Sequence, residues 1–137
     1  MEDAIRDALA ITHASSAWQR TVEITTTGAR SGLPRRIEIW FYRVGDTNYL
    51  SGMPGPTPDW YRNIEANPGF TFHLKHGVQA TLSALGRPVT DEAERRRVFT
   101  EIVADLNQPG NPGRISRPTT VQEWLDGSVL VAIAFED

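Results

Sequence analysis

Cysteine is absent from this chain of 137 residues. Disulfide bonds, thiolate metal sites and a cysteine nucleophile are therefore excluded. No apolar run approaches the roughly 20 residues that a membrane-spanning helix needs. The acidic segment MEDAIRDALA also lacks the basic and then apolar pattern of a secretory signal peptide. We expect a cytoplasmic protein without an integral membrane segment.

Signatures of several enzyme classes are missing as well. The sequence has no G-x-G-x-x-G motif, no P-loop and no serine in a nucleophile elbow. Dinucleotide binding of the Rossmann type, NTP hydrolysis and acyl transfer are therefore poorly supported. His73 and His76 have no carboxylate spaced to complete a metal site, and His13 has no partner one helical turn away. We expect surface histidines and no metal.

What remains is an ordinary globular composition, with 39% hydrophobic and 23% charged residues. The length fits a single domain, 1–137, with a real core. The net charge is −3, yet one stretch is basic, because five arginines there are accompanied by only two glutamates (Arg20, Arg30, Arg35, Arg36 and Arg43 against Glu23 and Glu38). A local basic patch on an acidic protein suits a small anionic ligand better than a nucleic acid.

The basic stretch has the pattern of a β-hairpin. Two β-type runs, Thr21–Thr27 and Arg35–Phe41, flank a turn-like link, Gly28–Pro34. In the second run apolar residues alternate with charged or aromatic ones, which predicts two different faces. The apolar face has Ile37, Ile39 and Phe41, and the mixed face has Arg36, Glu38 and Trp40. Glycines allow backbone N–H groups to converge on an anion, and guanidinium groups bind phosphate or carboxylate with two hydrogen bonds. The hairpin turn is therefore a candidate anion site beside an aromatic shelf.

The remaining pattern mixes strands and helices. We expect a helix at Glu2–Ser15 within an N-terminal helical region, 1–17, and a mobile loop at 107–118. The other expected elements are strands at Thr47–Gly52, Gly69–Lys75, Val78–Val89 and Ser128–Phe135, and helices at Pro58–Ala66 (capped by Thr57), from Asp91 to about Leu106, and from Thr120 to Gly127. In the long helix we expect Arg95, Arg96 and Arg97 to form a solvated face. This order is not doubly wound. It predicts an α+β protein, a split β-barrel of about six mostly antiparallel strands with inserted helices.

Two motifs carry a family resemblance. TTTGARSGLPRRIEIWF, followed by PDWYRNIEANP, is similar to the deazaflavin-dependent nitroreductase-like oxidoreductases, in which a TTxGRxSGxPR hairpin precedes a WxxNxxANP helix. The likeness runs from Thr21 to Val89 and weakly to the C-terminal strand. It implies the split β-barrel fold and transfer of hydride from reduced deazaflavin coenzyme F-420 to a quinone, an enone or a nitroaromatic acceptor.

The resemblance also implies site residues. Those assigned to the cofactor are Arg30, Ser31, Arg35, Arg36, Glu38, Trp40, Ser51, Gly52, Trp60 and Asn63. The family usually carries a lysine in the loop before the helix, whereas SGMPGPTP has none. Binding of an anionic tail would then be weaker or would depend on Arg30 and Arg36.

Several readings stay open at this point. Arg36 and Glu38 either pair on an exposed face or line the site, Trp60 either anchors the core or stacks near a flavin-like ring, and Asn63 either joins the hairpin to the helix or binds the cofactor. Tyr42 or solvent is the candidate proton donor. FMN is the alternative cofactor, and a carrier of fatty acids or other small molecules is the non-enzymatic alternative. Because split barrels often pair, we expect a homodimer.

Overall fold

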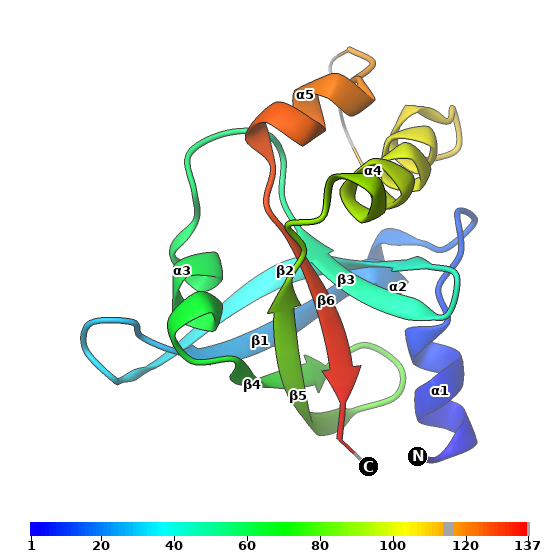
Figure 1. Ribbon diagram of the computed structural model, residues 1–137. Coiled ribbons are helices and arrows are strands. Elements are labelled where there is room, and N and C mark those ends of the chain that lie inside the picture. Colours follow the sequence, from blue (N-terminus) through cyan, green and yellow to red (C-terminus); the bar gives the residue numbers. More distant parts are fainter. Residues whose placement is uncertain (114–116, 137) are drawn as a thin grey trace.

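The computed structural model describes residues 1–113 and 117–136, so part of the loop predicted at 107–118 lies outside the described residues. Within them the chain forms five helices and six strands (Figure 1). The helices are α1 (Asp3–Leu9), α2 (Ala17–Arg20), α3 (Asp59–Ala66), α4 (Glu92–Asn107) and α5 (Val121–Gly127). The strands are β1 (Thr21–Thr27), β2 (Pro34–Val44), β3 (Thr47–Ser51), β4 (Gly69–Leu74), β5 (Ala80–Pro88) and β6 (Leu130–Phe135).

The six strands close into a barrel in the order β1-β2-β3-β6-β5-β4, and every neighbouring pair is antiparallel. This confirms the predicted split β-barrel with inserted helices. In β1, which has the predicted bounds, Val22, Ile24 and Thr26 are buried and the residues between them are half-buried. The strand therefore has one face inside the barrel and one outside, as a period of two requires.

The second strand differs from its predicted form. It begins at Pro34 and continues past Phe41 to Val44, and only Phe41–Val44 pairs with β3. The first part of β2 therefore pairs with β1 and not with β3, and it projects from the barrel as an arm. The predicted apolar face is buried at Phe41 but not at Ile37, which remains 38% exposed because the arm lies beyond the barrel core.

The N-terminal region contains two short helices instead of the single predicted one. The first helix ends at Leu9, since Ala10 leaves helical geometry with φ −86° and ψ 53°. A second helix begins after Ser16, whose side chain accepts a hydrogen bond from the N–H of Gln19 while the Gln19 side chain returns one to the Ser16 backbone. This capping box favours a new helix start at Ser16 over continuation of the first helix.

Two apolar cores are separated by the barrel wall. One fills the barrel and includes Ile24, Phe41, Leu50, Ile64 and Phe72, all fully buried. The other lies between the barrel and the pair α4 and α5, which Figure 1 shows together at one end of the molecule. It contains Trp124 of α5 and the predicted apolar stripe of α4, which consists of Val98, Phe99, Ile102, Val103 and Leu106.

The ends of α4 and α5 largely follow the sequence. The Asp91 carboxylate accepts the N–H of Glu94 at 2.9 Å, and Thr120 caps α5 by accepting the N–H of Glu123 at 3.1 Å. The expectation that Arg95 is solvated is wrong. Its guanidinium donates to the carbonyl oxygens of Val89, Leu125 and Ser128, which joins α4 to the end of α5.

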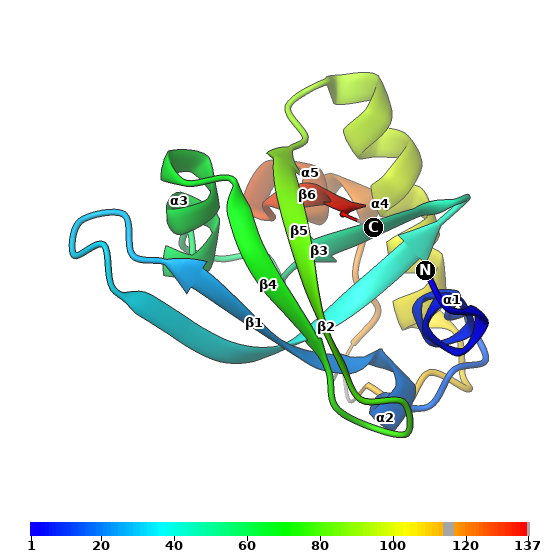
Figure 2. The same ribbon diagram turned by 90° about the horizontal axis from the view of Figure 1, so that it is seen from below.

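The start of α3 is also shifted. Pro58 is the N-cap and has no side-chain hydrogen bond, so the predicted cap at Thr57 is not formed. Both views place α3 beside the turn between β1 and β2, with α1 on the opposite side of the barrel (Figure 1 and Figure 2). Across the described residues, none of the helices combines the length and apolar character that crossing a bilayer requires.

Candidate functional site

The turn between β1 and β2 is held by its own hydrogen bonds. The N–H of Gly28 donates to the carbonyl of Leu33 at 2.8 Å, and the N–H of Gly32 donates to the carbonyl of Gly28 at 2.9 Å. Gly32 has a φ of 69°, and a Cβ on Gly28 would lie 2.4 Å from the Ser31 hydroxyl. These glycines are therefore needed for the shape of the turn, and their N–H groups are already engaged within it.

Asn63 attaches this turn to α3. Its side-chain oxygen accepts the N–H of Ala29 at 2.9 Å, and its side-chain nitrogen donates to the Thr26 hydroxyl at 3.0 Å. Asn63 and Thr26 are both buried. Trp60, one turn earlier on α3, is 9% exposed and packs in the barrel core. Two buried side chains thus fix the position of α3 against the hairpin.

A groove of about 700 Å³ lies between the hairpin and α3. The hairpin contributes Thr26, Gly28, Ala29, Arg30, Ser31, Arg35 and Ile37 to the lining of the groove. The other side is lined by Asp59, Trp60, Arg62 and Asn63 of α3, and by Thr57, which precedes this helix. Three arginines and one aspartate give this lining a formal charge of +2. Within residues 1–113 and 117–136, the side chains of these arginines make no salt bridge.

Unpaired arginines on two walls of a groove are available to an anion from solution. Arg30 and Arg35 come from the hairpin and Arg62 from the helix. The Ser31 hydroxyl accepts the N–H of Leu33 at 3.1 Å and keeps its own hydrogen to donate. The groove therefore combines cationic side chains, a hydroxyl donor and a partly apolar wall, a lining that suits an anion.

Five of the predicted site residues line this groove together: Arg30, Ser31, Arg35, Trp60 and Asn63. Trp60 has the position of a core anchor, and Asn63 has the position of a residue that joins the hairpin to the helix. The other predicted residues lie elsewhere, for reasons that differ from residue to residue.

Arg36 and Glu38 lie on the outer face of the barrel, because β2 alternates and Arg35 faces the groove. Neither of the two alternatives is found, since they do not pair with each other and neither lines the groove. The Arg36 Nε donates to Glu23 at 2.6 Å, and Lys75 bridges Glu23, at 2.9 Å, and Glu38. The hydrogen bonds from Lys75 and Arg36 lower the pKa of Glu23 to about 2. These charges therefore form a network of their own outside the groove.

Trp40, Ser51 and Gly52 are also outside the groove lining. The Arg20 guanidinium lies over the Trp40 ring, 5.4 Å from its centroid, and Trp40 packs on the core beneath α4. Ser51 is buried and its hydroxyl donates to the carbonyl of Val129 at 2.6 Å, which ties β3 to the start of β6. Of the two tryptophans predicted for the site, Trp60 lines the groove and Trp40 does not.

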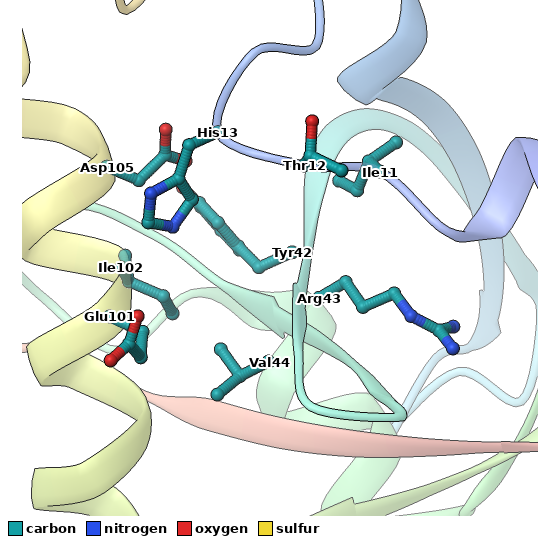
Figure 3. A pocket seen from close by; sticks show the side chains of 9 residues that line it. All are labelled: Ile11, Thr12, His13, Tyr42, Arg43, Val44, Glu101, Ile102 and Asp105. Atoms are coloured by element: carbon teal, nitrogen blue, oxygen red, sulfur yellow. The ribbon is translucent and has the colours of Figure 1, made fainter.

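Tyr42 lines a different and much smaller cavity, of about 10 Å³, which is the space of one water molecule. Figure 3 shows its ring between α4 and the segment that carries His13. Burial raises the pKa of its hydroxyl, and the nearby Asp105 carboxylate raises it further. A buried phenol with a raised pKa, away from the groove, is poorly placed to donate a proton there.

Beside this cavity lies a buried ion pair. Arg20 is 1% exposed, and its Nη2 donates to Asp105 at 3.2 Å as well as to the backbone carbonyls of Thr12 and His13. Gln108 also donates to Asp105, at 2.8 Å. This network joins the segment before α2 to the C-terminal end of α4. Arg20 is therefore a structural residue rather than part of a basic patch.

Of the three histidines, His13 is exposed as predicted, whereas His73 and His76 are half-buried. The Nε2 of His73 lies 2.8 Å from the Thr25 hydroxyl, and burial lowers the pKa of the imidazole. His76 packs against the exposed ring of Trp18, with centroids 3.9 Å apart. Across the part of the chain that is described, no group of three or more histidines and carboxylates is arranged to hold a metal ion.

Sequence reasoning missed two charged residues of the groove, Asp59 and Arg62. A signal for both was available. Asn63 belongs to the recognised helix motif, and residues three and four positions apart share one face of a helix, so Asp59 and Asn63 lie on the same side. Arg62 adjoins that face and follows Asp59 by three residues.

Comparison with known protein families gives a match over most of the chain. A family model described as F420H(2)-dependent quinone reductase matches residues 9–122. The chain belongs to this family. The match spans the hairpin, α3 and the whole groove.

Solved structures support the fold of this quinone reductase family member. A conserved hypothetical protein, Rv2991 from Mycobacterium tuberculosis, is similar over 100% of this chain and 82% of its own, with 20% identity and a TM-score of 0.69. An F420-H2 dependent reductase, FDR-A, is similar over 85% of this chain and 94% of its own, with 24% identity and a TM-score of 0.56. A FAD-binding protein from Mesorhizobium loti is similar over 100% of this chain and 91% of its own, with 15% identity and a TM-score of 0.60.

Proposed function

We propose that this protein is an oxidoreductase that binds coenzyme F-420 in the groove between the hairpin and α3. The acceptor class would be an electron-poor quinone, enone or nitroaromatic. The observation that carries the proposal is the set of three arginines without salt bridges on two walls of one groove, in a chain whose family is named for F420H(2).

The residues of the groove fit such a cofactor. A volume of about 700 Å³ lies within the range of roughly 300–1,000 Å³ common for small-molecule sites. Arg30 and Arg35 can each bind a phosphate or carboxylate oxygen pair, and Ser31 can add a neutral donor. Trp60 and Ile37 offer apolar surface to a flat ring. The cationic and apolar parts of the lining thus match an anionic tail and an aromatic head.

The chemistry divides between the cofactor and the chain. When bound, reduced F-420 supplies the hydride. The chain orients the tail through its arginines, holds the groove in shape through Asn63 and shields one side of the site with Trp60. Reduction of a quinone, enone or nitro group also consumes protons. Because Tyr42 lies at another cavity, solvent entering the groove is the proton source that we propose.

Titration of the purified apo-protein with oxidised coenzyme F-420, followed by quenching of tryptophan fluorescence, tests this proposal. We expect saturation in the micromolar range, and weaker binding by the variants Arg35→Ala and Trp60→Ala. Arg97→Ala is the matched control, because Arg97 is an exposed arginine on α4 outside the groove. Unchanged binding in both groove variants would refute the site assignment.

Parallel titrations separate the alternatives. Binding of FMN alone would assign the protein to flavin chemistry on the same fold. If neither cofactor binds, and mass spectrometry of the purified protein finds a bound fatty acid, the carrier function would take precedence. Turnover of a quinone or a nitroaromatic with reduced F-420 would establish the acceptor class.

A further inference from the structure

We propose that Arg62 of α3 is an anion-binding residue, the third cation of the groove, and that it makes the site selective for ligands with more than one negative charge. This inference rests on the proposed function of the groove. The segment 52–58, which leads from β3 to α3, reads GMPGPTP and contributes no cation. Arg62 is therefore the cation that the α3 side of the groove supplies.

The packing of α3 fixes the position of the Arg62 backbone relative to the hairpin. Its two neighbours toward the core, Asn63 and Ile64, are buried, and Asn63 makes two hydrogen bonds to the hairpin. The helix therefore cannot turn about its axis without breaking both bonds. Arg62 is therefore held at the groove, which it lines from α3, while Arg30 and Arg35 line it from the hairpin.

The charges around Arg62 leave it available. Asp59 precedes it by three residues and lines the same groove, but no salt bridge joins the two side chains. The three guanidinium groups that line the groove carry like charges, and a bound anion would relieve their repulsion. A single negative charge can reach one wall, whereas a ligand with several anionic groups can engage both.

Charge-changing variants of the full chain test this role. We expect Arg62→Ala to raise the Kd for oxidised coenzyme F-420 about tenfold at low salt, and Arg62→Lys to restore most of the affinity. Asp59→Asn removes the opposing charge and should lower the Kd. Because salt screens the lost interaction, the Arg62→Ala effect should shrink as the salt concentration rises. Arg97→Ala should match the unmodified protein.

A second probe separates this inference from the proposed function. Inorganic tripolyphosphate carries several negative charges and no ring, and inorganic sulfate carries fewer. We expect tripolyphosphate to compete with F-420 in the unmodified protein and to lose that ability in Arg62→Ala.

The outcomes are distinct. If F-420 binds to Arg62→Ala as it does to Arg97→Ala, the role of Arg62 is overturned while the proposed function stands. If F-420 does not bind but tripolyphosphate binds and depends on Arg62, the proposed function fails and Arg62 remains an anion-binding residue. If neither binds to the unmodified protein, or if sulfate binds as tightly as tripolyphosphate, the inference fails.

Discussion

Replacing Asn63 by alanine should weaken both the fold and the groove. Asn63 is 6% exposed and joins α3 to the hairpin through two hydrogen bonds, of 2.9 Å to Ala29 and 3.0 Å to Thr26. Each such bond contributes about 1 kcal/mol net, and a buried group left without its partner costs about 1–3 kcal/mol. The Thr26 hydroxyl is such a group, since Thr26 is 2% exposed. We therefore expect Asn63→Ala to lower the free energy of unfolding by about 2–4 kcal/mol.

Urea unfolding, followed by tryptophan fluorescence and circular dichroism, measures this loss. Glu65→Ala is the control, because Glu65 is an exposed residue of the same helix, and the change there should stay within about 0.5 kcal/mol. Hydrogen exchange at the Ala29 amide provides a local measurement, since that N–H loses its acceptor in the Asn63 variant. We expect its protection to fall further than that of amides in β6.

The same variant should bind F-420 less tightly even under conditions where it is fully folded, because Arg30 and Arg35 are then carried by a hairpin that is no longer held against α3. A free energy of unfolding equal to that of Glu65→Ala would refute the reasoning. It would mean that the backbone hydrogen bonds between the strands position the hairpin without any contribution from Asn63.

Three further predictions concern residues outside the groove. Arg20→Met should lower the free energy of unfolding by about 3–5 kcal/mol, measured in urea, because Asp105 would remain buried without its cation. The carboxyl of Glu23 should titrate with a pKa of about 2 by NMR and move toward its ordinary value of 4.5 in Lys75→Ala; its contribution to stability is present above pH 4.5 and is lost as the pH falls toward 2. Gly86→Ala should cost about 1–3 kcal/mol in thermal or urea unfolding, because a Cβ there would lie 2.7 Å from a buried isoleucine of α3.

Much of the fold could be predicted from local patterns. The strand Thr21–Thr27 has a clear period of two, and Asp91 and Thr120 are capping residues with a partner three positions on, so these elements appear where the sequence indicates. The N-terminal helix was predicted with the wrong end. Its weak apolar stripe continues past Leu9, and the capping-box spacing of Ser16 and Gln19, which is visible in the sequence and marks a new helix start, was missed.

The site was predictable where it lies on one hairpin and not where it depends on packing. Arg30 and Arg35 follow from the turn and the alternation of the strand. The ion-pair partner of Arg36 is Glu23, on the neighbouring strand, and the register of two strands is not visible in either one alone. Trp40 was expected in the site because it is aromatic, but its face of β2 contacts Arg20 and the second core.

The place of β6 in the barrel sets the order in which the molecule can be completed. This last strand pairs with β3 on one side and with β5 on the other. During synthesis, the edges of both partners therefore stay open until residues 130–135 have left the ribosome. The groove, in contrast, is built from residues 26–63. The half of the chain that forms the groove is made early but gains a closed core only when β6 is added, so the nascent protein must keep two sheet edges from pairing with other chains in the meantime.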